Sequence, residues 1–305
     1  MNYLNRISKV YNSAERVFFD DNSKFILMSD CHRGDGSWSD SFSRNRNIFF
    51  AALSHYYKKG YTYIEIGDGD ELWENRSFQN IVDQHRDAFW IMKEFYDKGR
   101  FYMIYGNHDM VKKKEKFTEE NLYQYFRQRD GKIITLFKDI KVHEGLVLKH
   151  REDGTEILLL HGHQVDFLNS DIWKIARFLV RYFWKPLENF GVNDVTRTAK
   201  NYEKKNEMAK KLTEWAVKEN KIIIAGHNHK PMLDSDNMVP YFNDGSCVHP
   251  RCITGLEIAE GNIQLVKWSV KARDTGELLI GRDTLAGPVK IKNYINNNFV
   301  VTHNN

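Results

Sequence analysis

Short apolar runs alternate with longer amphipathic stretches through the first third of the chain. The runs cover 24–29, 61–66 and 101–105, and the stretches between them, 44–59 and 79–98, repeat apolar residues every three or four positions. Apolar runs of this length predict buried strands, whereas the three- and four-residue repeat predicts helices with one buried face. The resulting order, βαβαβ, predicts a mainly parallel sheet with crossover helices, and therefore an α/β fold.

Two further apolar runs follow, at 156–160 and 221–225, and the pattern between them is helical. We interpret residues 165–220 as a helical insertion within a single domain that spans 1–305. The C-terminal part changes to alternating runs and turns that are typical of β-hairpins. No internal repeat or low-complexity linker divides the chain.

Composition narrows the class of protein. The chain has 305 residues, of which 41% are apolar, and this is enough to bury a sizeable core. The net charge is only +4, and basic residues form no concentrated block, so nucleic acid is not the favoured partner. The three cysteines are scattered without a CxxC pair, which suits a reducing compartment. We therefore expect a cytoplasmic protein, because no run approaches the length of a membrane span or of a signal peptide.

Each apolar run ends in a polar cluster. In open α/β sheets, ligands bind beyond the carboxyl ends of the strands, so we expect these clusters to meet at one edge. Residues two apart in an extended segment point the same way and can grip one ion. A glycine before three of the candidate ligands is expected to let the backbone turn sharply. The clusters are Asp30-Cys31-His32, Gly67-Asp68, Gly106-Asn107-His108-Asp109, His161-Gly162-His163 and Gly226-His227-Asn228-His229.

These clusters supply more metal ligands than one ion can use. Carboxylate, amide and imidazole groups without a thiolate favour manganese, iron or zinc, and manganese is our first choice. Two divalent ions about 3.5–4 Å apart that share a carboxylate would use all the ligands and suit phosphoryl transfer. Two such ions and two carboxylates leave a formal charge of about +2, which attracts phosphate. The candidate ligands are Asp30, His32, Asp68, Asn107, His161, His227 and His229.

His108 follows the ligand Asn107 directly and is the candidate general acid. An imidazole beside a ligand, but turned away from the metals, can give a proton to the leaving-group oxygen while a metal-bound hydroxide attacks phosphorus. We expect Asp109 to orient this imidazole.

The five clusters, read as DxH, GD, GNHD, HGH and GHxH in this order, resemble the calcineurin-like metallophosphoesterase superfamily over residues 24–270. The resemblance implies a four-layer α/β/β/α sandwich with a two-metal site and hydrolysis of phosphoric esters or pyrophosphates. It also implies that Asp68 bridges the two ions. One ion would be held with Asp30, His32 and His229, and the other with Asn107, His161 and His227.

The stretch GDGDELW, with Glu71 and Trp73, resembles the second motif of UDP-2,3-diacylglucosamine diphosphatases. The substrate implied is a phosphodiester or pyrophosphate with a bulky, lipid-linked or nucleotide-linked group. Two alternatives remain: a nuclease or nucleotide phosphodiesterase or phosphomonoesterase, and a non-catalytic scaffold on the same fold. We expect Asp70 and Glu71 to brace the loop that carries the bridging ligand.

Five side chains are candidates for substrate contact, because they follow the motifs and can bind phosphate or line the site. They are Arg33, Arg44, Arg46, His163 and Asn243.

The segment 172–190 is apolar on more than one side and carries basic residues between its aromatic ones. Such a helix must bury a second face. We expect it to form a lid over the site. The alternatives are a partner subunit, an acyl chain or a peripheral contact with the inner face of a membrane. The oligomeric state is left open by the sequence.

Overall fold

The computed structural model describes residues 2–127, 130–165 and 202–295. Most of the predicted insertion, 165–220, lies outside the described residues, and so does the proposed lid segment 172–190. The helices are α1 (Tyr3–Ser13), α2 (Arg46–Lys58), α3 (Phe78–Gln84), α4 (Arg86–Asp97), α5 (Glu115–Asn121) and α9 (Tyr202–Glu219), with 3-10 turns η1 (Met110–Lys113), η2 (His163–Val165) and η5 (Ile291–Tyr294).

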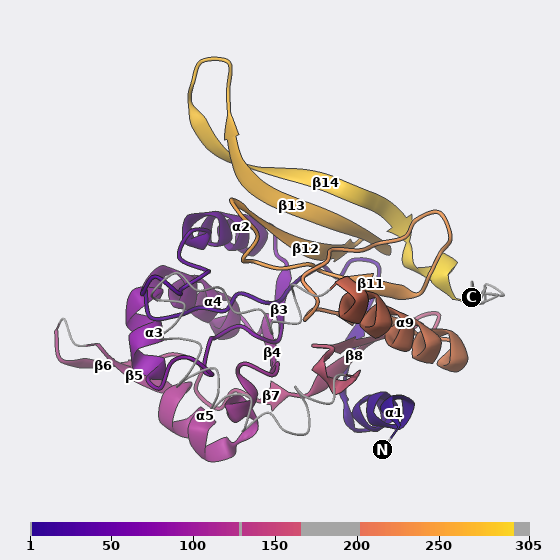
Figure 1. The fold of residues 1–305 in the computed structure, drawn as a ribbon, viewed down its shortest axis with the longest axis horizontal. Helices are drawn as coiled ribbons and strands as arrows, with labels where there is room; N and C mark the ends of the chain where they lie inside the picture. Colours follow the sequence, from indigo (N-terminus) through magenta and orange to yellow (C-terminus); the bar gives the residue numbers. More distant parts are fainter. Residues whose placement is uncertain (1, 128–129, 166–201, 296–305) are drawn as a thin grey trace.

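Two main sheets form the centre of the molecule (Figure 1). One has the order β14-β13-β12-β2-β3-β4-β7, the other has the order β1-β8-β9-β10-β11, and β5 and β6 form a small separate hairpin. The strands are β1 (Glu15–Phe19), β2 (Phe25–Met28), β3 (Thr62–Ile66), β4 (Phe101–Ile104), β5 (Gln124–Arg127), β6 (Lys132–Thr135), β7 (Val142–His143), β8 (Gly145–His150), β9 (Glu156–Leu160), β10 (Ile222–Ala225), β11 (Tyr241–Asn243), β12 (Cys252–Ala259), β13 (Asn262–Ala272) and β14 (Leu278–Lys290).

Three buried apolar clusters separate four layers. The first packs α2, α3 and α4 on the outer face of the larger sheet, and its members include Phe49 and Met92. The second lies between the two sheets, where Leu27 and Leu159 meet. The third packs α1 and α9 on the outer face of the smaller sheet, around Trp215. The predicted α/β/β/α sandwich is therefore confirmed, and Figure 1 shows the two helical layers on opposite sides.

The predicted strands all form, within a residue or so of the expected ends. The predicted helix 79–98 is divided, because α3 ends at Gln84 and α4 begins at Arg86, with His85 between them. The expected single sheet edge is also wrong, because β2, β3 and β4 belong to one sheet whereas β9, β10 and β11 belong to the other. The parallel strands of both sheets nevertheless bring their ligand-bearing loops to a common region.

Among the described residues, no helix is both long and apolar enough to cross a membrane.

Glu156, at the start of β9, connects the smaller sheet to its outer layer. Its carboxylate accepts a hydrogen bond from the Tyr11 hydroxyl of α1 and pairs with Lys221 at 2.6 Å and Lys149 at 3.1 Å. Burial alone would raise the pKa of this carboxyl, but these donors lower it to about 2. The ionised form is therefore favoured by folding.

Glu156→Gln should reduce the stability of the protein at neutral pH by roughly 1–2 kcal/mol, since Lys149 and Lys221 remain partly exposed and solvent screens the pairs. Because the folded pKa is below the unfolded one, this stability is present above about pH 4.5 and is lost as the pH falls toward 2. Urea unfolding at pH 7, 5 and 3 measures the effect. The midpoints of the two proteins should converge at low pH, and a constant difference would contradict the assignment.

Candidate metal centre

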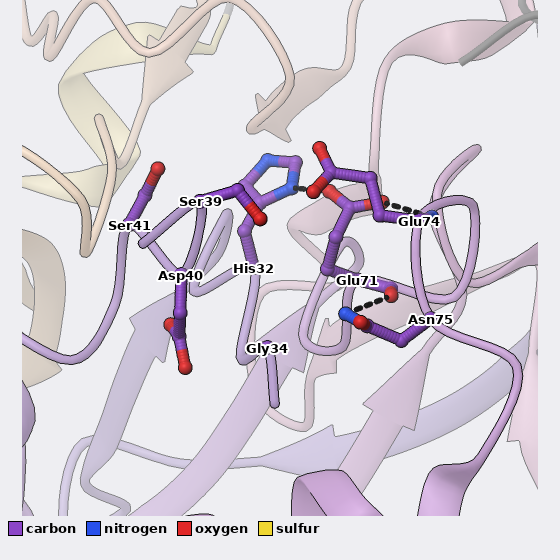
Figure 2. A pocket seen from close by; sticks show the side chains of 8 residues that line it. All are labelled: His32, Gly34, Ser39, Asp40, Ser41, Glu71, Glu74 and Asn75. Carbon is purple, nitrogen blue, oxygen red and sulfur yellow. Dashed lines mark hydrogen bonds and ion pairs between the residues drawn. The ribbon is translucent and has the colours of Figure 1, made fainter. Parts of the chain in front are cut away.

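The loops after β2 and β3 run side by side and continue the sheet pairing beyond the strand ends. The Asp30 amide donates to the Gly67 carbonyl at 3.1 Å, and the His32 amide donates to the Asp68 carbonyl at 2.9 Å. His32 Nδ1 then lies 2.9 Å from Glu71 Oε2, at one wall of a small pocket (Figure 2). The first two predicted ligand clusters are therefore fixed to each other by backbone hydrogen bonds.

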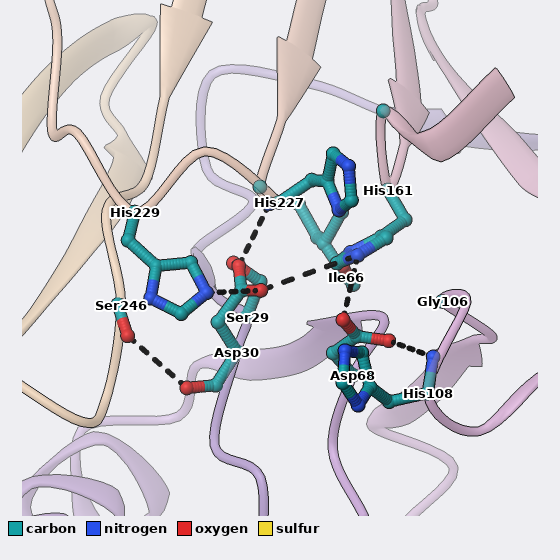
Figure 3. A network of polar contacts seen from close by, with 12 residues as sticks. Ser29, Asp30, Ile66, Asp68, Gly106, His108, His161, His227, His229 and Ser246 are labelled. Atoms are coloured by element: carbon teal, nitrogen blue, oxygen red, sulfur yellow. Dashed lines mark hydrogen bonds and ion pairs between the residues drawn. The ribbon is translucent and has the colours of Figure 1, made fainter. Parts of the chain in front are cut away.

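Asp30, His32 and His229 form one group of potential ligand atoms, and all three atoms lie within 4.8 Å of one another. Asp30 Oδ1 lies 3.0 Å from His229 Nε2 and 3.6 Å from His32 Nε2. The other carboxylate oxygen of Asp30 accepts a hydrogen bond from the His227 amide at 2.8 Å. Asp30 thus links the loop after β10 to the loop after β2 (Figure 3).

Asp68, His161 and His227 form a second such group. His161 Nδ1 faces the Ile66 carbonyl at 2.9 Å, which leaves Nε2 directed at Asp68 Oδ2, 3.1 Å away. The same oxygen of Asp68 lies 3.8 Å from His32 Nε2 in the first group. One carboxylate oxygen therefore faces both groups, as a shared ligand would.

The donor set fits divalent cations. The buried atoms that make no hydrogen bond within the part of the chain that the structure describes include Asp30 Oδ1, His32 Nε2, Asn107 Oδ1 and His161 Nε2. Buried polar atoms normally have partners, so four such atoms on the strand-end loops point to a cation-binding site. All four belong to predicted ligands, and two imidazoles and two oxygens are ligands that manganese, iron and zinc accept.

Strained backbone also marks several of the candidate ligands. Positive φ angles occur at Asp30 (52°), His32 (47°), Asp68 (49°), His227 (68°) and His229 (54°). Five candidate ligands are thus among the ten non-glycine residues with this conformation in the described chain. Each costs on the order of 1–3 kcal/mol, and such strain concentrates at functional sites.

Two of the glycines are needed for close approach. A Cβ on Gly106 would lie 2.1 Å from Asp68 Oδ1, and one on Gly226 would lie 2.2 Å from Ser29 Oγ. Neither has a positive φ angle, so the expected role in a sharp turn holds only for Gly67, whose φ is +81°. The side chains of the metal centre, not the course of the backbone, require glycine at 106 and 226.

Electrostatics keep the two carboxylates ionised. Burial alone would raise the pKa of Asp30, but His229 and His161 hold it well below its usual range. The pKa of Asp68 is likewise lowered, against burial, by His161 and His108. In return these carboxylates raise the pKa of His161 to about 9, although burial opposes this. The carboxylate oxygens of the centre are therefore anionic at neutral pH, and an anionic oxygen is the form that binds a cation.

The orienting partner of His108 is Glu71. His108 Nδ1 lies 2.9 Å from Glu71 Oε1, and its ring stacks on Trp73 with the ring centroids 4.3 Å apart. The second oxygen of Glu71 contacts His32, so one carboxylate positions a ligand and the candidate acid together. The predicted orienting role of Asp109 is wrong, because its carboxylate accepts from the amides of Gly106 and Gly69 instead. Glu71 lies three residues after the candidate ligand Asp68, and this spacing was the available signal.

Arg33 is a structural residue, so its predicted contact with substrate is wrong. Its guanidinium is completely buried and pairs with Glu65 at 2.7 Å and Asp70 at 2.7 Å. Lys112 is equally buried and bridges Asp70 and Asp109. These charges lie beneath the metal centre and join the loops after β2, β3 and β4.

The other predicted substrate contacts differ in their surroundings. Arg44 is exposed, and Arg46 is tied to Asp87 at 3.3 Å. His163 is buried and packs against His161, with ring centroids 5.6 Å apart, so it lies behind a ligand.

Asn243 is also buried, and its amide shapes the loop after β10. It donates to the Gly226 carbonyl at 2.8 Å and accepts from the Gly245 amide at 2.9 Å. The predicted contact of Asn243 with substrate is therefore wrong as well.

Ser29 and Asp244 support the centre, and neither is among the predicted site residues. The Ser29 hydroxyl lies 2.5 Å from Asp30 Oδ2 and 2.7 Å from Asp244 Oδ1. Burial, together with the nearby Asp30, raises the pKa of Asp244 well above its usual range. No local motif could have indicated this contact, because 215 residues separate Ser29 and Asp244.

Comparison with known proteins places this geometry in a family. A crystal structure of Vps29 from Chaetomium thermophilum aligns with 87% of this chain and 97% of that chain, at 9% identity and a TM-score of 0.36. No curated protein sequence matches the chain. The family model for calcineurin-like phosphoesterases matches residues 23–231, which contain all seven candidate ligands. That match covers well over half of the sequence, and the chain therefore belongs to the calcineurin-like phosphoesterase family.

Proposed function

We propose that this protein is a two-metal-ion hydrolase of a phosphodiester or pyrophosphate. The observation that carries the proposal is the shared carboxylate oxygen of Asp68, which lies 3.8 Å from His32 Nε2 and 3.1 Å from His161 Nε2. A carboxylate in this place can bind two ions at once. Asp30, His32 and His229 would complete one coordination sphere, and His161, His227 and Asn107 would complete the other.

The ions would supply Lewis acidity and lower the pKa of a bound water. The chain itself orients the candidate acid. With Nδ1 of His108 held by Glu71, Nε2 is the nitrogen that holds or gives a proton. Stacking on Trp73 restricts rotation of the His108 ring, and the His108 amide donates to Asp68 Oδ1 at 2.8 Å. The acid is therefore fixed relative to the bridging ligand, which favours proton transfer to a leaving group bound at the centre.

A second motif supports the choice of substrate class. The resemblance of the GDGDELW stretch to the second motif of UDP-2,3-diacylglucosamine diphosphatases favours a pyrophosphate with a lipid-linked or nucleotide-linked group. We further propose manganese as the metal and a cytoplasmic location, with contact at the inner membrane face if the substrate carries acyl chains. A phosphodiesterase acting on nucleotides and a non-catalytic scaffold are outcomes that the following experiments distinguish.

Asp68→Ala should abolish turnover because it removes a ligand from both ions. Loss of a residue that only supports a ligand costs about 10–100-fold in activity, so loss of the shared ligand should cost at least about 100-fold. The measurement compares rates of the manganese-loaded protein on a phosphomonoester, a phosphodiester and a UDP-linked pyrophosphate. Their rank order identifies the substrate class.

Asp97→Ala, at the exposed end of α4, is the matched control and should keep the wild-type rate. Elemental analysis should give two manganese ions per wild-type chain. Two bound ions without turnover of any substrate would contradict the proposed hydrolase and favour the scaffold.

Glu71→Gln should lower kcat about 10–100-fold while metal content falls little, because the ligands remain and only the hydrogen-bonded support of His108 and His32 is weakened. The pH dependence of kcat should also change, since the ionised partner of the acid is lost. Glu74→Gln is the control, since Glu74 lines the same pocket but belongs to none of the groups of potential ligand atoms. Equal rates and pH profiles for the two variants would show that Glu71 does not orient the acid.

A further inference from the structure

The loop after β11 packs against the candidate ligand Asp30. The Asp30 carbonyl accepts hydrogen bonds from the Ser246 hydroxyl at 3.2 Å and from the Cys247 amide at 3.3 Å. Figure 3 shows Ser246 beside Asp30. The buried side chain of Asn45 holds the end of this loop, since its amide donates to the His249 carbonyl at 2.7 Å. His249 is therefore fixed near the Asp30 side of the metal centre.

Helix α9 brings Lys205 toward the same centre. The helix contacts β10 and β11, and Figure 1 shows it beside β11. Its buried Met208 lies close to two ligand clusters, because a Cβ on Gly162 would be 3.6 Å from Met208 Cε and 3.4 Å from His227 Cβ. Lys205 precedes Met208 by three positions, so the two side chains are neighbours on one face of the helix.

The charges of Lys205, Lys230 and His249 act on one another and on the ligands. Burial lowers the pKa of Lys205, and the charge of Lys230 lowers it further, whereas Asp30 raises it. Burial likewise lowers the pKa of His249, and His229 and Lys205 add to this effect. Lys230 directly follows the ligand His229 in the chain. Two lysines from separate elements therefore lie on the side of the centre that Asp30 and His229 form.

A cation at the metal centre would leave these two ammonium groups without a compensating charge. Asp30 is the carboxylate that favours the protonated form of Lys205. Its oxygens face His229 Nε2 at 3.0 Å and the His227 amide at 2.8 Å, so its charge belongs to the metal centre. A divalent ion bound to Asp30 would offset that charge, and the ammonium groups of Lys205 and Lys230 would then face only positive charge. An anionic group of the substrate would relieve this repulsion.

We propose that Lys205 and Lys230 form a subsite for a second phosphate group, which lies next to the phosphoryl group held at the metal centre. An ammonium group is a compact charge that suits phosphate oxygens. A pyrophosphate carries its second anionic group across a single bridging oxygen, whereas the ester group of a phosphodiester has no charge in that place. The inference rests on the proposed function and narrows its substrate class from phosphodiesters and pyrophosphates to pyrophosphates.

The test measures binding, so that it does not depend on turnover. Manganese-loaded protein is titrated with methylphosphonate, which has one phosphonate group, and with methylenediphosphonate, which has two and no P–O–P bond to cleave. Equilibrium dialysis at one fixed concentration of free manganese makes chelation by the diphosphonate equal for all variants. The wild type should bind the diphosphonate roughly tenfold or more tightly than the monophosphonate, because charged hydrogen bonds are added.

The decisive variant replaces both lysines, Lys205→Gln with Lys230→Gln. It should lose affinity for the diphosphonate on the order of tenfold and keep its affinity for methylphosphonate, because the metal ligands are unchanged. Lys205→Arg with Lys230→Arg should retain most of the diphosphonate affinity, since both charges remain. Lys210→Gln removes an exposed lysine of the same helix and should change neither affinity. Manganese content equal to that of the wild type shows that each variant is folded.

Unchanged diphosphonate affinity in the double Gln variant, or an equal loss for both ligands, would overturn the subsite. If the wild type still hydrolyses a phosphodiester in an Asp68-dependent manner, the proposed function stands without it. Lysine-dependent binding of the diphosphonate without turnover of any ester or pyrophosphate would instead support the subsite and contradict the hydrolase.

Discussion

The metal centre depends on a network of buried charges beneath it. Arg33 pairs with Glu65 and Asp70, and Lys112 pairs with Asp70 and Asp109. Desolvation of such charges is costly, and removing one partner leaves another buried and uncompensated, at a cost of about 3–5 kcal/mol. Glu65 lies on β3, and the other four residues follow the ends of β2, β3 and β4. The network therefore locks three ligand-bearing loops in one arrangement. This holds whether each ion pair stabilises or destabilises the folded protein on balance.

This rigidity accounts for the strained backbone of the ligands. Asp30, His32 and Asp68 all have positive φ angles, which the chain would relax if the surrounding loops could move. Asp109, at the end of the buried network, accepts hydrogen bonds from the amides of Gly69 and Gly106, which lie on either side of Asp68. The buried network holds the backbone, and the backbone in turn places the carboxylates and imidazoles before any ion binds. Such preorganisation is what a metal-binding site requires.

The sequence predicts local features of this site well and tertiary ones poorly. Strand-end ligands such as Asp30 and His161 were predictable because an apolar run that stops at a polar cluster is a local pattern. Arg33 was misassigned because an arginine after a ligand motif looks the same whether it faces phosphate or a buried Glu65. The support of Asp30 by the distant Asp244, through Ser29, left no local signal. The candidate ligand residues were thus visible in the sequence, whereas the residues that hold them in place could be identified only from the fold.

The division of the predicted helix 79–98 illustrates how one departure from the local pattern serves the site. The apolar repeat continues through the break, so periodicity alone favours one helix. The interruption at His85 instead frees this residue to end α3 and begin α4, and its ring reaches Asp40 across 45 positions of sequence. Asp40 in turn fixes the loop whose Ser39 and Ser41 face the metal centre. A helix without the break would place position 85 by helical geometry alone, so the broken helix and the rigid pocket wall are two consequences of one buried contact.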